Sequence, residues 1–154
     1  MEREDEVSMN VMTNFEERKR EKQLTIERKL LRELSIEEVK KSVIIHFNVM
    51  RIGVGCLEEV VEEACFDVAI EAYLNGGEFS RFTIHGETME MAKKRCHQDI
   101  THFIDTLYYF WLYWDYGKKM ISDEDLFLAC EHFVDYWWVN GYRKGERRYK
   151  LRLH

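Results

Sequence analysis

The stretch Cys65-Phe-Asp-Val-Ala-Ile-Glu-Ala-Tyr-Leu74 is apolar on nearly every side of a helix, and Asn75-Gly76-Gly77 follows it. Only neighbours on most sides can cover such a helix, so this stretch predicts the central helix of the fold, over about 57–74. Gly and Asn accept the left-handed backbone that closes a helix end. We therefore expect the central helix to stop at 75–77.

Two acids interrupt this apolar helix. Asp67 and Glu71 are one turn apart, so they lie on one face. At about 100° per residue, Glu71 falls within the expected inward stripe and Asp67 lies at its edge. The stripe itself consists of Leu57, Val60, Val61, Ala64 and Val68. A buried carboxylate is costly unless it is paired or hydrogen-bonded, so the two acids mark a candidate site.

The composition indicates one folded domain. The chain has 154 residues, with four Trp, eight Tyr and nine Phe but no proline. A chain of this length suits one domain with a sizeable core, and large aromatic rings supply much of the buried area. Proline breaks helix interiors, so its absence favours long uninterrupted helices.

Capping residues and helical spacing divide the rest of the chain. A charge-rich helix with a narrow apolar seam is expected over 14–34. It either projects from the body, where it would pair with its twin in a dimer, or lies along the bundle. Ser35 and Glu38 form a capping box for a second helix, with His46 at the edge of its apolar face. The other expected features are a glycine break at 53–55, a loop over 78–86, a long aromatic helix over 88–116 closed by Gly117, and a last helix from Ser122 to Asn140-Gly141.

These segments predict an all-α fold, a bundle of four or five helices around the central helix. We expect a flexible N-terminus over 1–12, a single helical domain over 13–141 and a basic C-terminal tail over 142–154. The tail alternates basic and apolar residues at a strand period, so we expect it to be extended. An aromatic cluster is expected between the last two long helices, formed by Trp111, Trp114, Trp137 and Trp138.

The charge is unevenly distributed along the chain. Residues 56–139 carry 17 acids and 6 bases, whereas residues 140–154 carry one acid and six bases. The acidic body argues against broad nucleic-acid binding, which needs a basic surface. The basic tail either binds an anionic partner, with nucleic acid a weak option, or lies on its own acidic body. The partner-binding candidates in it are Arg143, Lys144, Arg147, Arg148, Lys150 and Arg152.

The cysteines indicate a reducing compartment. Cys56, Cys65, Cys96 and Cys130 form no C-x-x-C pair, and neither a secretory signal nor a membrane-spanning run is apparent. We expect reduced, mostly buried thiols in a cytoplasmic protein. A zinc site would require all four to converge from separate helices, and we disfavour it.

One constellation could carry chemistry. Asp67, Glu71, Asp99 and His102 would converge if the central and long helices are neighbours, and such a set suits one divalent metal. The Glu-x-x-His pairs of di-iron bundles are absent. The alternative, which we prefer, is that no cofactor binds and that the acids accept hydrogen bonds and fix helix register. In both cases Asp67→Ala or Asp99→Ala should destabilise the fold.

Two longer motifs resemble a known family. They are Cys-Phe-Asp-Val-Ala-Ile-Glu-Ala-Tyr-Leu-Asn-Gly-Gly77 and Tyr-Trp-Trp-Val-Asn-Gly-Tyr followed by Lys150-Leu-Arg-Leu. Both resemble the YbaK-type family of short proteins of bacilli, a domain of unknown function that is distinct from the tRNA-editing protein of the same name. The resemblance covers most of the chain. It implies a bacterial cytosolic protein and supplies no catalytic residues.

The sequence therefore favours a non-catalytic interaction or regulatory protein that binds a protein partner or self-associates through its N-terminal helix or its tail. Phosphate-cradling glycine loops, nucleophile elbows and H-E-x-x-H helices are missing. The first alternative is a metal-dependent enzyme with the carboxylate and histidine site, and the second is anionic-partner binding by the tail. No motif identifies a substrate or a pathway.

Overall fold

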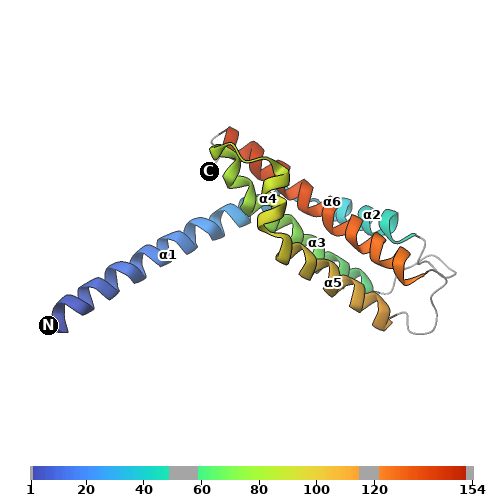
Figure 1. Ribbon diagram of the computed structural model, residues 1–154, viewed down its shortest axis with the longest axis horizontal. Coiled ribbons are helices and arrows are strands. Elements are labelled where there is room, and N and C mark those ends of the chain that lie inside the picture. Colours follow the sequence, from blue (N-terminus) through green and yellow to red (C-terminus); the bar gives the residue numbers. More distant parts are fainter. Residues whose placement is uncertain (1, 49–58, 115–121, 152–154) are drawn as a thin grey trace.

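The computed structural model describes residues 2–48, 59–114 and 122–151, which are almost entirely helical and contain no strand. The predicted all-α fold is confirmed (Figure 1). The elements are α1 (Glu2–Arg32), α2 (Ile36–His46), α3 (Glu59–Phe79), the 3-10 helix η2 (Ser80–His85), α4 (Met89–Arg95), α5 (His97–Trp114) and α6 (Asp123–Lys150). The expected glycine break at 53–55, the stop at Gly117 and Arg152 lie outside the described residues.

The helix starts predicted at Ser35 and Ser122 are confirmed. The hydroxyl oxygen of Ser35 accepts a hydrogen bond from the backbone N–H of Glu38 at 3.4 Å. That of Ser122 accepts one from the N–H of Asp125 at 3.1 Å. Each bond satisfies one of the N–H groups that a helix start leaves without a partner. In contrast, α1 begins at Glu2 and not at residue 14, where this helix was expected to start.

The centre of the bundle is a pair of helices rather than one. α3 and α6 pack most extensively on each other, and each also contacts α1, α2, α5 and η2. α3 does not stop at Asn75-Gly76-Gly77, as predicted, but continues to Phe79. A Cβ at Gly76 would overlap the backbone carbonyl of Trp138 on α6. The glycines therefore serve close helix packing, which outweighs the cost of about 1 kcal/mol for Gly inside a helix.

The predicted end of the last helix at Asn140-Gly141 is wrong for the same reason. A Cβ at Gly141 would overlap the backbone carbonyl of Tyr73, and one at Gly145 would overlap the Ser80 hydroxyl. These small residues let α6 run alongside α3 as far as Lys150. Residues 142–150, which we expected to be extended, are consequently helical.

The long helix expected over 88–116 is divided at Cys96. α4 and α5 meet there at an angle, and the backbone of Cys96 has φ −103° and ψ 23° (Figure 1). Its thiol is buried and donates to the carbonyl of Ala92 at 3.1 Å. Neither Pro nor Gly marks the bend, so hydrophobic periodicity did not reveal it.

The segment 78–86, expected to be a loop, completes α3 and then forms η2. Gly86 closes η2 in the left-handed conformation at φ 85°. Phe79 and Phe82 are half-buried, with ring centroids 6.1 Å apart. Two guanidinium groups, those of Arg81 and Arg95, lie over the ring of Phe82, at 4.8 and 4.6 Å.

The four tryptophans do not form one cluster. Trp111 stacks on Phe47 with centroids 4.8 Å apart, whereas Trp138 stacks on Tyr142 at 5.3 Å. Trp137 meets the edges of two tyrosines, and Trp114 is 38% exposed. The buried indoles have different ring partners, because α6 presents Trp137 and Trp138 in successive directions about its axis and Trp111 comes from α5.

Three of the four cysteines are free and buried: Cys65, Cys96 and Cys130. Burial raises the pKa of Cys65 to about 12 and that of Cys96 to about 11. Since the thiolate is the reactive form, we expect these three thiols to resist iodoacetamide in the native protein at pH 8 and to react on unfolding. Alkylation followed by peptide mass spectrometry checks this, and rapid native labelling of Cys65 would contradict it.

Candidate functional site

The two acids of the central helix face solvent, which corrects the predicted inward orientation. Asp67 and Glu71 are both exposed. The buried stripe of α3 runs through Val61, Cys65 and Val68 and on to Ala72, whereas Val60 is 50% exposed. The stripe is thus displaced by about one residue, or 100°, from the predicted one. In a helix that is apolar nearly all round, periodicity does not fix which side faces the core.

The metal-site residues are not brought together. Among the described residues, no group of three or more His, Cys, Asp or Glu side chains is arranged to hold a metal ion. His102 is exposed on α5, with its ring 6.3 Å from that of Phe103. Asp99 instead accepts a hydrogen bond from the side-chain amide of Asn75 at 3.1 Å. Asp99 thus accepts a hydrogen bond from another helix, which is the role that the alternative to a metal site gave to these acids.

The structure changes the expected effect of two substitutions. Asp67→Ala should alter the free energy of unfolding by less than about 0.5 kcal/mol, because the side chain is exposed. Asp99→Ala should cost about 1 kcal/mol, because it removes the acceptor of Asn75. Urea unfolding of both variants measures the difference. A larger loss for Asp67→Ala than for Asp99→Ala would contradict this placement.

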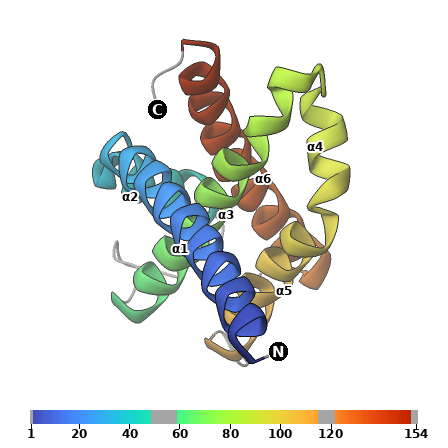
Figure 2. The ribbon, with the colours of Figure 1, turned by 90° about the vertical axis from the view of Figure 1, so that its left-hand side faces the viewer.

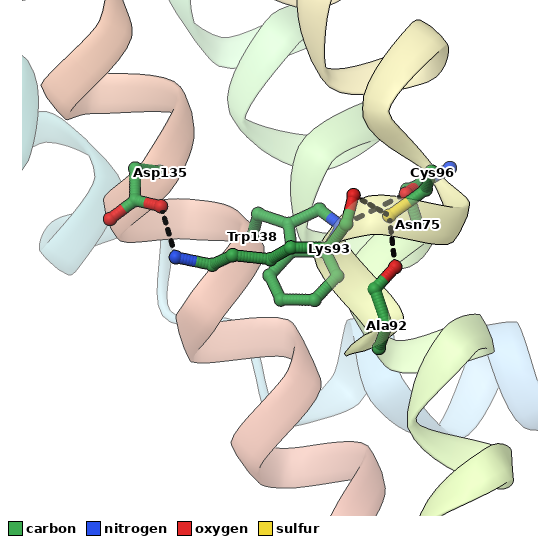
Figure 3. Close-up of polar contacts among 6 residues, drawn as sticks. All are labelled: Asn75, Ala92, Lys93, Cys96, Asp135 and Trp138. Atoms are coloured by element: carbon green, nitrogen blue, oxygen red, sulfur yellow. Dashed lines mark hydrogen bonds and ion pairs between the residues drawn. The ribbon is translucent and has the colours of Figure 1, made fainter. Parts of the chain in front are cut away.

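Asn75 is the centre of a polar network that the sequence did not reveal. Its side-chain oxygen accepts a hydrogen bond from the indole N–H of Trp138 at 2.9 Å, while its amide donates to Asp99. Lys93 lies over the Trp138 ring at 5.8 Å and pairs with Asp135 at 2.6 Å (Figure 3). This network joins α3, α4, α5 and α6. Its groups are partnered with one another, which suits a structural role.

A groove of about 600 Å³ runs beside this network, between α4–α5 and α6. Its lining residues include Lys93, His97, Phe127, Glu131 and His132. Both histidines are exposed, as expected for His132. The groove is lined by apolar side chains and by polar side chains of both charges.

The basic C-terminal residues bind the chain's own first helix. The ammonium group of Lys144 donates to the backbone carbonyl of Glu33 at 2.8 Å, just beyond the end of α1. Arg148 donates to the carbonyl of Lys29 at 3.3 Å and pairs with the Glu33 carboxylate at 2.7 Å. Cations at a helix C-terminus satisfy free carbonyls and oppose the negative end of the helix dipole. Of the other tail residues, Lys150 pairs with Glu146, and Arg143 and Arg147 are exposed.

α1 contacts the body near its C-terminal end. The Tyr73 hydroxyl donates to the carbonyl of Leu30 at 2.7 Å, and Leu30 is buried. Every side chain from 14 to 25 is exposed. α1 accordingly projects from the bundle along most of its length, which was one of the two alternatives (Figure 1). Figure 2 looks from the side on which α1 projects and shows it leaving the bundle over α3.

A crevice of about 250 Å³ lies where α1 leaves the body. α1 contributes most of its wall, and α3, η2 and α6 close it. The residues that define it include Lys19, Lys22, Gln23, Ile26, Leu30, Leu74, Glu78, Arg81 and Tyr149. Burial raises the pKa of the Tyr149 phenol, so the phenol stays neutral at physiological pH. The crevice is lined by apolar side chains together with three bases and two acids, which are Lys19, Lys22, Arg81, Glu27 and Glu78.

Comparison with known proteins agrees with the resemblance in the motifs. The family described as "Protein of unknown function (DUF2521)" matches residues 9–154. The chain belongs to this family. A relative in Bacillus subtilis (strain 168), "Uncharacterized protein YbaK", is 30% identical over 149 residues, which cover 94% of this chain and 99% of that protein. No solved structure matches the DUF2521 chain. None of its described helices has the length and apolarity needed to cross a membrane.

Proposed function

We propose that this DUF2521 protein is a non-catalytic interaction or regulatory module, whose binding element is the projecting part of α1 together with the crevice at its base. The observation that carries the proposal is the exposure of every side chain from 14 to 25, including Phe15 at 70% and Leu24 at 45%. An isolated helix of this length is marginally stable in water. A protein partner that covers α1 would stabilise it.

The packing of the body supports the same proposal. Its helices are joined by partnered polar groups, such as Lys93 with Asp135, and by the close contact of α3 with α6. Lys144 and Arg148 fix the end of α1 and so set the direction in which the helix leaves the body. The body is therefore a rigid base for a presented helix. The buried free cysteines support our assignment of the protein to the cytoplasm.

Native mass spectrometry of untagged protein purified without chelator tests this function. We expect a metal-free assembly heavier than the 18.7 kDa of one chain, and its mass should fall to that of the shortened chain when residues 2–25 are removed. Circular dichroism of the shortened chain verifies that the body still folds. A stoichiometric metal that is lost in the Asp99→Asn, His102→Ala variant would contradict the proposal and favour the metal-enzyme alternative. A metal-free single chain would contradict self-association through α1 and leave a different protein as the partner.

A further inference from the structure

The exposed face of α1 that continues into the crevice follows a heptad spacing. Phe15, Lys19, Lys22 and Ile26 are separated by four, three and four residues, so they share one side of the helix. Lys19, Lys22 and Ile26 line the crevice, and Phe15 lies on the same side one turn further out. The same spacing of three and four residues continues toward the N-terminus through Met12, Ser8 and Asp5. We call these seven positions, from Asp5 to Ile26, the seam.

The two ends of this helix carry opposite charge in the sequence. Residues 2–6 are four acids and one base, whereas residues 18–22 are four bases and one acid. If two copies of this helix packed side by side in parallel, their acidic ends would lie together and so would their basic clusters. In an antiparallel pair, the acidic end of each helix lies against the basic cluster of the other. The two helix dipoles then point in opposite directions, which is also favourable.

We propose that a second copy of this chain occupies the exposed face of α1, with the two helices antiparallel and Asp5 of each opposite Lys22 of the other. This inference rests on the proposed function and names its partner. In this register Met12 lies opposite Phe15 and Ser8 opposite Lys19, so the seam positions pair among themselves. The apolar layers lie at the centre and the charge pairs outside them, and polar residues at seam positions specify register in coiled coils at a cost in stability.

The length of the projecting helix fits this arrangement. Residues 2–25 span about 36 Å, or roughly three heptads, which is enough for a helix pair. The N-terminal end of the partner helix reaches the mouth of the crevice beside Lys22. The two bodies are held at opposite ends of the helix pair, so they do not collide.

Charge reversal tests the register. Lys22→Glu should weaken dimerisation on the order of tenfold or more, because two attractive pairs become repulsive. Asp5→Lys should weaken it similarly. The double variant Asp5→Lys, Lys22→Glu should restore the dissociation constant to within about threefold of the original, since both pairs are attractive again. The matched control is Lys41→Glu, which makes the same charge change at an exposed position of α2, away from the helix pair, and should leave dimerisation within about threefold.

Sedimentation equilibrium measures all four variants and the chain that lacks residues 2–25. A dimer that resists Lys22→Glu but is lost with residues 2–25 would overturn the antiparallel pairing and leave α1 as the binding element. A dimer that survives the loss of residues 2–25 would overturn both this inference and the proposed function. Failure of the double variant to regain affinity would overturn the pairing of Asp5 with Lys22.

Discussion

Gly141→Ala should lower the free energy of unfolding by about 2–3 kcal/mol, although alanine is the better helix former. In an exposed helix this substitution would stabilise by about 1 kcal/mol. Here the new methyl group would overlap the backbone carbonyl of Tyr73, and a backbone group cannot rotate away as a side chain can. α3 and α6 would have to separate along the most extensive contact in the bundle.

Chemical denaturation monitored by circular dichroism measures this effect. His132→Ala serves as the control, because it lies on the exposed side of the same helix and should change stability by less than about 0.5 kcal/mol. A Gly141→Ala variant as stable as the original protein would show that α3 and α6 are not in close contact. The α3–α6 axis of the bundle would then be wrong.

Trp137→Ala should cost about 3–5 kcal/mol, the range for removing a large side chain from a core. Trp137 is fully buried, and its indole N–H donates to the Ser42 hydroxyl at 3.0 Å, which ties α6 to α2. The edge of Tyr73 on α3 meets the same indole, with ring centroids 6.5 Å apart. One substitution therefore weakens the contacts among three helices, and thermal unfolding should show a large drop in Tm.

Two further variants separate the contributions of Trp137. Trp137→Phe keeps most of the apolar ring but leaves the buried Ser42 without its indole donor, so it should cost about 1–2 kcal/mol. Tyr136→Ala removes a neighbouring ring that is 47% exposed and should cost much less than Trp137→Ala. Equal losses for Tyr136→Ala and Trp137→Ala would contradict the burial of the indole.

The sequence was sufficient for the fold class and for the starts of the helices that Ser35 and Ser122 cap, because these depend on local signals. Ser35 and Ser122 cap their helices with the bonds that their side chains predict. The helix ends that the glycines predicted were wrong. Gly76 and Gly141 have two competing uses, a left-handed stop and close helix packing, and only the neighbouring helix decides between them. The bend at Cys96 has no local signal at all.

The candidate site was harder to predict, for a related reason. The apolar surroundings of Asp67 and Glu71 predict that both face inward, but the core side of a helix that is apolar on most sides is set by tertiary contacts rather than by periodicity. The exposure of α1 could be predicted, because its alternating charges and sparse apolar residues indicate a solvated helix. The role of Lys144 and Arg148 at the end of α1 was not, because it depends on contacts between residues more than 100 positions apart.

Hydrogen–deuterium exchange at two protein concentrations tests most directly whether α1 is the binding element. Amides of residues 9–24 should be protected at a concentration where the protein assembles and should exchange rapidly after dilution, because a lone helix opens readily. Amides of α3 and α6 should stay protected at both concentrations. Exchange in α1 that does not change with concentration, in a protein that does assemble, would place the contact elsewhere and contradict the account.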